Sequence, residues 1–155
     1  MKIKNQESGR SLIEVIGAMA IASVIAVGAF AAYQLATTRM DRTITTEELR
    51  DITRNARILF AGRDNFGGIS VNFMVRMGAL RNDTPPRIAQ DFSINAVAGG
   101  GFAINLYGLS HSNCLWISMQ YFGFISGVII NDMHLGHPSE HCTNGRNNTA
   151  TLVVL

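Results

Sequence analysis

The segment Leu12–Leu35, LIEVIGAMAIASVIAVGAFAAYQL, decides the fold of this 155-residue chain. Nineteen of its 24 residues are apolar, and only one, Glu14, is charged. As a helix it would extend over ~36 Å, enough to cross a bilayer core of ~30 Å. Lys2, Lys4 and Arg10 precede it, and basic residues keep that end of a membrane helix in the cytoplasm. We therefore expect one membrane-spanning helix, with the C-terminal bulk of the chain exported.

Composition supports this view. Charged residues make up only 15% of the chain, against ~25% in typical soluble domains. The apolar excess is concentrated in the N-terminal segment, because the other residues have an ordinary apolar share. The chain is too apolar to be disordered. Its net charge of +2 is too small to indicate a nucleic-acid partner by itself.

A cleaved secretory signal is the other interpretation of this N-terminus. The apolar core of such a signal is usually ~7–15 residues long and ends at a small-residue cleavage site. Here the run is longer and continues into a charged helical pattern. Glu14 lies just inside the run, where its carboxylate either reaches the headgroups or needs a cationic partner, because an ionised group inside a membrane is costly.

The residues from Gly9 to Ile16, GRSLIEVI, resemble the type IV prepilin signature. In that family Gly precedes the cut, the next residue becomes the new N-terminus, and Glu stands at position five of the mature chain. The resemblance implies that prepilin peptidase cuts between Gly9 and Arg10, and that Glu14 pairs with the free amine of a neighbouring subunit. The family usually has an apolar residue where this chain has Arg10. That departure bears on N-methylation of the new terminus and offers a second cation for Glu14.

Beyond Leu35 the pattern becomes amphipathic. Apolar residues recur at three- and four-residue steps: Ile44, Leu49, Ile52, Ala56, Leu59 and Phe60. No proline interrupts residues 11–84, and Gly62 is a stop signal, so we expect one helix from about Ser11 to Ala61. Within its membrane half, small residues stand four apart (Ala18, Ala22, Ala26; Gly28, Ala32), which lets helices approach closely. That spacing suits a helix bundle at a filament core. The alternative is that these small residues have no packing role and the helix is a single membrane anchor.

Five arginines lie on this helix: Arg39, Arg42, Arg50, Arg54 and Arg57. A DNA-binding face is one interpretation of them. Acidic residues are interleaved, however, with Glu47 and Asp51 three residues before Arg50 and Arg54, the spacing of helical ion pairs. The pattern therefore favours a solvated, salt-bridged face.

The C-terminal half predicts a short helix followed by a sheet. We expect the helix within Gly67–Gly78, a loop at Asn82–Pro86, and strands at 92–97, 102–109, 127–131 and 149–154. The segment Leu115–Phe124 favours a helix over a strand. A second membrane span over Leu115–Ile130 is the weaker alternative, because the segment is short and contains Ser118, Gln120 and Ser126.

The expected fold class is therefore α+β, with a long N-terminal helix packed against a small antiparallel sheet. We divide the chain into a leader (1–9), an apolar membrane and assembly helix (10–35), its amphipathic continuation (36–62) and a globular region (63–155). The spacing of elements from Val71 to Cys114 also resembles type IVb pilins, particularly the thin-pilus subunits of conjugation systems. The leader of nine residues is shorter than many in that subclass.

Two cysteines, Cys114 and Cys142, stand 28 positions apart on the side of the membrane where disulfides form. A bridge between them is expected on that ground, and the resemblance implies the same bond. A zinc site is the competing interpretation, because His134, His137 and His141 lie near Cys142, with His111 near Cys114. The spacings fit no zinc module, and solvated loop histidines are the simpler interpretation.

The resemblance implies a structural subunit of a type IV pilus, made in the bacterial inner membrane and polymerised into an extracellular fibre for adhesion or conjugative contact. Its partners would be further copies of itself, prepilin peptidase, and the pilus assembly platform with its ATPase. A pseudopilin of a type II secretion system or a minor pilin is the alternative within this architecture, and a monomeric membrane-anchored binding domain is the alternative outside it. No catalytic motif is present, so we expect no enzyme activity, cofactor, metal or nucleic acid.

The long helix does not explain a second feature of the composition, a stretch without charged residues. Phe92–Asn131 contains no Asp, Glu, Lys or Arg over 40 residues. We expect it to form the buried sheet together with surface that neighbouring subunits cover.

Overall fold

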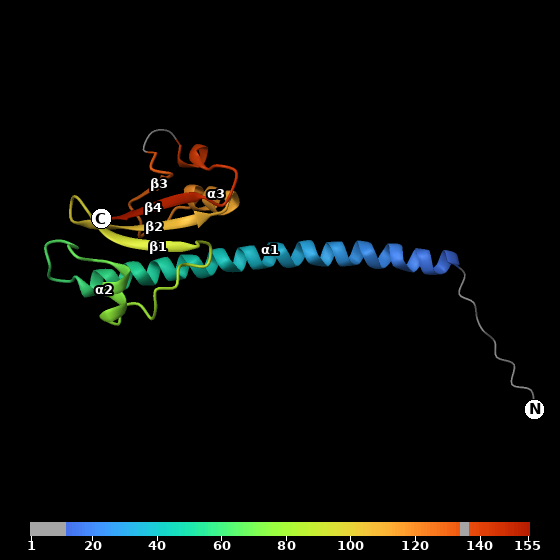
Figure 1. Ribbon diagram of the computed structural model, residues 1–155, viewed down its shortest axis with the longest axis horizontal. Coiled ribbons are helices and arrows are strands. Elements are labelled where there is room, and N and C mark those ends of the chain that lie inside the picture. Colours follow the sequence, from blue (N-terminus) through green and yellow to red (C-terminus); the bar gives the residue numbers. More distant parts are fainter. Residues whose placement is uncertain (1–11, 134–136) are drawn as a thin grey trace, which may run out of the picture. The chain divides into compact units, whose positions relative to one another are not determined.

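The computed structural model describes residues 12–133 and 137–155, and its fold is α+β, as predicted. The elements are α1 (Leu12–Leu59), α2 (Val71–Arg76), β1 (Asp91–Val97), β2 (Gly101–Leu109), α3 (His111–Met119), β3 (Gly127–Ile130), the 3₁₀ helix η1 (Pro138–His141) and β4 (Asn148–Val154) (Figure 1). The chain divides into two compact units, Met1–Met40 and Asp41–Leu155.

The first unit consists, in its described part, of the apolar half of α1. Among the described residues this is the one helix that is long and apolar enough to cross a membrane, and nothing in its most apolar stretch is buried. Large apolar side chains such as Ile13, Val24 and Phe30 are 62–78% exposed. The predicted first residue of the helix, Ser11, lies outside the described residues.

At its other end α1 stops at Leu59, two residues before the expected Ala61. The last turn tightens, because the Ala61 amide donates to the Ile58 carbonyl three residues back, at 3.2 Å. Phe60 is buried beyond the helix end, and Gly62 follows in the left-handed region (φ +84°). The glycine stop signal is therefore right, and the helix ends slightly earlier so that Phe60 can enter the core.

The second unit is built on a four-stranded antiparallel sheet in the order β1-β2-β4-β3. All four strands lie within one residue of their predicted bounds. The C-terminal strand β4 is inserted between β2 and β3, so the chain end is part of the sheet. At the β1–β2 hairpin, Gly99 and Gly100 have φ of +98° and +89°, and a side chain on Gly101 would clash with the Val154 carbonyl.

One face of the sheet packs against the second half of α1. Alternate strand residues point into this core, among them Ile94, Ile104 and Leu152, and α1 contributes Leu49 and Ile52. The predicted apolar face of α1 is confirmed at Leu49, Ile52 and Phe60, which are 0–5% exposed. The same face also buries two threonines, Thr45 and Thr53, whose hydroxyls have no hydrogen-bond partner within the described residues.

The helix predicted at Leu115–Phe124 is present but begins and ends earlier, at His111 and Met119. Ser110 caps it, because its side chain accepts a hydrogen bond from the Asn113 amide. Gln120 is extended and ends the helix. The residues from Leu115 to Ile130 thus form part of α3, a loop and β3, and they do not form one membrane-spanning helix.

Candidate functional site

The first candidate surface is the N-terminal end of α1 around Glu14. Glu14, Ala18 and Ala22 are spaced four apart and line one shallow groove together with Val15 and Met19. The Glu14 carboxylate has no hydrogen-bond or ion-pair partner among the described residues. A single carboxylate beside small residues on an exposed apolar helix is suited to receive a cation from another chain in a medium that excludes water.

The residues on the other side of the expected cut are not placed. Gly9 and Arg10 lie outside the described residues, and so does the leader. Pairing between Arg10 and Glu14, and the cleavage itself, stay predictions.

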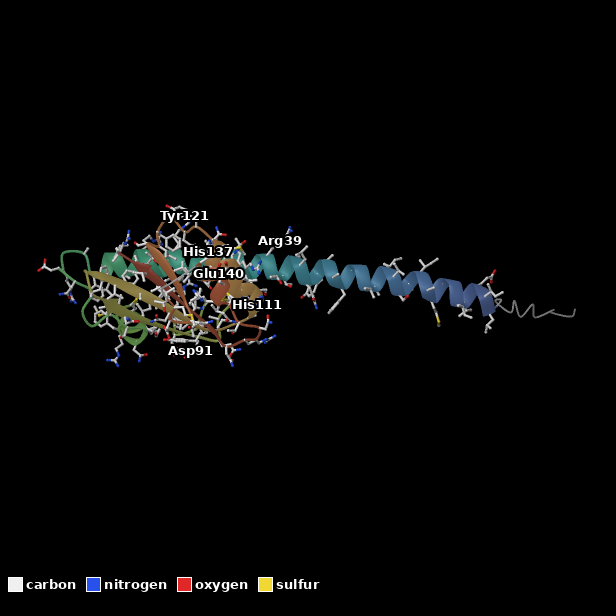
Figure 2. The ribbon with its side chains drawn as sticks, turned by 90° about the horizontal axis from the view of Figure 1, so that it is seen from above. Arg39, Asp91, His111, Tyr121, His137 and Glu140 are labelled. Atoms are coloured by element: carbon white, nitrogen blue, oxygen red, sulfur yellow. A yellow bond between two sulfur atoms is a disulfide. The ribbon has the colours of Figure 1, made fainter. Side chains whose placement is uncertain are left out.

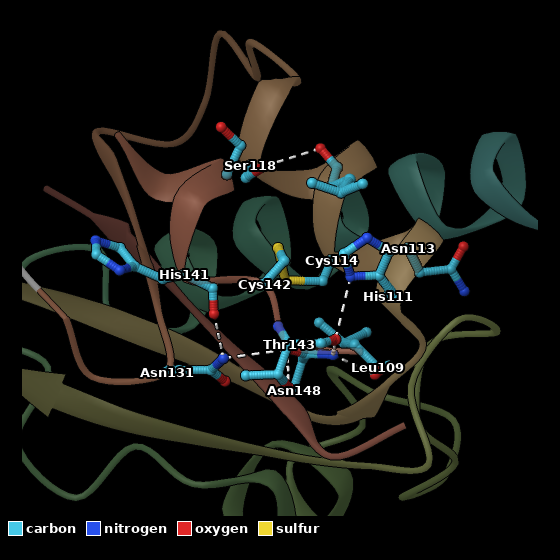
Figure 3. Close-up of a disulfide and its surroundings, with 12 residues drawn as sticks. Leu109, His111, Asn113, Cys114, Ser118, Asn131, His141, Cys142, Thr143 and Asn148 are labelled. Atoms are coloured by element: carbon cyan, nitrogen blue, oxygen red, sulfur yellow. Dashed lines mark hydrogen bonds between the residues drawn. A yellow bond between two sulfur atoms is a disulfide. The ribbon is translucent and has the colours of Figure 1, made fainter. Parts of the chain in front are cut away.

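The second candidate site is the disulfide region of the second unit. The predicted bond between Cys114 and Cys142 is present, and it joins α3 to the segment after η1 (Figure 3). Cys114 is fully buried, and Cys142 packs against the core. The bridge therefore fixes the long connection between β3 and β4 to α3.

A buried asparagine fixes the same connection from the other side. Asn148, at the start of β4, is 0% exposed, and its Oδ1 accepts hydrogen bonds from the Thr143 amide (2.7 Å) and from the Asn131 side chain (3.1 Å). Its Nδ2 donates to the carbonyls of Leu109 (3.2 Å) and Thr143 (3.0 Å). Asn131 in turn donates to the His141 carbonyl at 2.7 Å (Figure 3). Asn131 and Asn148 thus connect β2, β3, β4 and η1, and the buried amide group of Asn148 has partners for both its oxygen and its nitrogen.

The described histidines do not form a metal site with the cysteines. Both sulfurs are joined to each other, so neither thiolate is available as a ligand. His111 contacts the Thr143 carbonyl through Nδ1 at 3.1 Å, and His137 contacts Ser139 Oγ at 3.1 Å. Within residues 12–133 and 137–155, no three His, Cys, Asp or Glu side chains are grouped as metal ligands would be. His134 lies outside this part of the chain.

The arginine face of α1 is used largely within the molecule. Arg42 donates to the Ser112 carbonyl at 3.0 Å and lies over the Trp116 ring, while Arg50 lies over Phe124. Arg57 donates to the Leu155 carbonyl at 3.1 Å. These cations therefore attach α3, the loop after it and the chain end to α1.

Of the two predicted ion pairs, Asp51 with Arg54 is present at 3.3 Å on the exposed side of α1. The pair of Glu47 with Arg50 is not found among the described residues, because Arg50 lies over Phe124. A further contact was not predicted: the Arg87 amide donates to the Glu48 carboxylate at 3.2 Å, and the Arg87 guanidinium lies 3.8 Å from Asp41. These contacts hold the loop between α2 and β1 against α1.

Sequence reasoning also missed Asn131 and Asn148. Asn131 and Asp132 stand next to each other after an apolar strand, and such a pair is a known turn signal. Both have positive φ (51° and 59°), and Ile130 pairs with Met133 across them, as in a two-residue hairpin turn. The signal at Asn131 was therefore readable, whereas nothing local marks Asn148 as buried.

Two further side chains of the second unit are exposed to solvent. Tyr121, in the loop after α3, is 89% exposed, and Glu140 of η1 is exposed as well (Figure 2).

A scan against protein-family models and a search of the curated proteins found no match to this chain. Function therefore has to be argued from these sites.

Proposed function

We propose that this chain is a structural subunit of a type IV pilus. It is made in the bacterial inner membrane, cut by prepilin peptidase between Gly9 and Arg10, and polymerised through α1 into an extracellular fibre. The assembly platform and its ATPase drive polymerisation, and the chain itself has no enzyme activity. The fibre serves adhesion or conjugative contact.

The observation that carries the proposal is the exposed apolar half of α1, with a single carboxylate at Glu14. A helix with no buried residue in its apolar stretch needs a partner for that surface, which is first the bilayer and then other copies of the same helix. The cost of placing a carboxylate in such a medium is offset when an amine from a neighbouring chain lies beside it. Because only one stagger of two helices brings both charges together, the pair would also set the register of the fibre.

The second unit supports export. Its disulfide is of the kind that forms outside the cytoplasm. Its strands pack on the second half of α1, and α1 is a single helix from Leu12 to Leu59 that also includes the apolar half. This arrangement is what a subunit needs if its helix is to leave the bilayer and enter a fibre while its folded part stays intact.

The test is the substitution of Glu14. We expect Glu14→Ala and the isosteric Glu14→Gln to leave export and cleavage unchanged and to abolish fibres, as seen by negative-stain microscopy of sheared material. Glu47→Ala, which removes an exposed carboxylate of α1 in the second unit, is the matched control and should give normal fibres. Normal fibres from both Glu14 variants would reject the proposal.

The same experiment separates the alternatives. A major pilin gives abundant extracellular fibres that consist of this chain. A pseudopilin or minor pilin is processed in the same way but does not form abundant fibres alone. A monomeric membrane-anchored domain shows neither cleavage after Gly9 nor any dependence on Glu14.

A further inference from the structure

A groove on the surface of the second unit combines positive charge with an apolar floor. This arginine groove is lined by Arg50, Thr53, Arg54, Arg57, Ile58, Ala61 and Phe124 and has a volume of about 360 Å³. Ile58 in its lining is 67% exposed, so a large aliphatic side chain lies open to solvent beside three arginines. The groove therefore offers an apolar contact and an anion site at one place.

The arginines keep donors for a ligand. Each guanidinium carries five N–H donors, and Arg57 uses one of them on the Leu155 carbonyl. Arg50 lies over the Phe124 ring, and Arg54 is 67% exposed beside its partner Asp51. The lining of the groove contains three arginines and no acidic side chain, although Asp51 lies beside it, and such a lining suits a carboxylate with an apolar neighbour.

The same chain carries such a group at the turn after β3. Asp132 is the second residue of the two-residue hairpin turn, and Met133 follows it. We call these two residues the acidic turn. Asp132 is exposed and Met133 is 56% exposed. Among residues 12–133 and 137–155, the Asp132 carboxylate has no hydrogen-bond or ion-pair partner. The turn therefore presents a carboxylate that the described residues leave without a partner, next to an apolar side chain.

Groove and turn lie at opposite ends of strand β3. At one end Gly127 pairs with Val153, close to the chain end that Arg57 holds. At the other end Ile130 pairs with Ala150, and the acidic turn follows directly. Because the two surfaces are complementary but separated by the length of a strand, they can meet only between copies. Contacts of this head-to-tail kind generate open helical assemblies where the rotation between copies does not close into a ring.

We propose that the acidic turn of one copy docks into the arginine groove of the next copy in the fibre, with Asp132 against the arginines and Met133 on the floor at Ile58. The inference rests on the proposed function, since it names a contact between subunits of the same fibre. It gives the folded units a contact of their own, in addition to that of the apolar helices.

Chemical cross-linking tests the contact directly. The chain has lysines only at positions 2 and 4, within the leader that cleavage removes, so Arg54→Lys gives a mature chain with one lysine. A carbodiimide joins that side chain to a carboxylate only where the two touch. We expect mass spectrometry of treated fibres to find the introduced lysine linked to Asp132, and Asp132→Asn to remove this link. Arg76→Lys, on the exposed side of α2, is the matched control and should give no link to Asp132.

Charge exchange gives a second measurement. Arg54→Glu and Asp132→Lys, each alone, should lower fibre yield at least about fivefold, because like charges then meet at every contact. The double variant should recover to within about twofold of the original chain. Glu140→Lys, a reversal at an exposed site, should leave the yield unchanged.

The outcomes separate this inference from the proposed function. Fibres that show no link to Asp132, or a link from the introduced lysine to a carboxylate other than Asp132 and its intramolecular neighbour Asp51, overturn the inference and leave the pilus function standing. Failure of the double variant to recover, with both single variants folded, also overturns it. If the unsubstituted chain makes no fibres, the proposed function fails and this contact fails with it.

Discussion

Replacing Asn148 by alanine should destabilise the second unit strongly, although Asn148 lies far from the apolar helix in sequence. The side chain accepts from the Thr143 amide and from Asn131, and it donates to the carbonyls of Leu109 and Thr143. Alanine removes both groups and leaves these partners without their bonds. Thr143 is exposed and can bind water instead, but Leu109 is 0% exposed and Asn131 is half-buried.

The magnitude follows from those two sheltered partners. A buried polar group left without a hydrogen bond costs ~1–3 kcal/mol, so the loss at Leu109 and Asn131 together comes to about 2–6 kcal/mol of unfolding free energy. A small domain has a total stability of ~5–15 kcal/mol. The variant should therefore be close to unfolding under mild conditions, even with its disulfide intact.

The assay is urea unfolding of the full chain in detergent, followed by fluorescence. Trp116 is the single tryptophan, and it packs against Phe122 in the second unit, so its emission reports this unit alone. Asn147→Ala, at the exposed neighbouring position, is the matched control and should change stability by less than ~0.5 kcal/mol. A cost below ~1 kcal/mol for Asn148→Ala would refute the reasoning, because the asparagine pair would then not hold the connection.

Two further predictions use the same assay. The double substitution Cys114→Ser with Cys142→Ser should lower the unfolding free energy by about 3–4 kcal/mol, since the bond closes a loop over a sequence separation of 28; a change below ~1 kcal/mol would show that the bond contributes little. Thr45→Val and Thr53→Val should each raise the unfolding free energy by ~1 kcal/mol, because they replace buried hydroxyls that lack partners in the described residues by methyl groups of similar shape. Thr46→Val, which removes a hydroxyl that bonds to the Arg42 carbonyl, should not stabilise, and equal gains at all three positions would contradict the explanation.

Much of the fold was predictable because its signals are local. The uninterrupted apolar and amphipathic periodicity specifies α1, and glycine runs bounded by alternating residues specify β1 and β2. The predicted bounds of α3 were wrong because they were placed by the apolar residues of 115–124, whereas the helix begins after the cap at Ser110. Helix bounds depend on such a cap more than on the hydrophobicity that follows it.

The parts that could not be predicted depend on distant partners. Asn148 is satisfied by a carbonyl 39 positions away at Leu109, and no local pattern announces that contact. The arginines of α1 looked like a solvated face, but Arg42 and Arg50 lie over aromatic rings brought to them by α3 and its loop. Only the exposed pair of Asp51 and Arg54 follows from helical spacing alone.

The charge-free stretch has a partial explanation in the same terms. Strand residues such as Phe92, Ile94 and Ile104 lie in the core, which accounts for the apolar residues on one face of these strands. The opposite face carries neutral polar side chains that bond to one another, as between Asn105 and Ser93 at 3.0 Å and between Thr151 and Asn105 at 2.9 Å. Coverage of this face by neighbouring subunits stays a prediction.

The most direct test of the central claim is the N-terminus of this chain in sheared surface fibres. Cleavage after Gly9 leaves the apolar helix on a mature chain of 146 residues, so N-terminal sequencing and intact mass together decide the matter. The account predicts fibres composed of this chain starting at Arg10. A chain that starts at Met1, or beyond Leu35 as after removal of an ordinary signal, would contradict it.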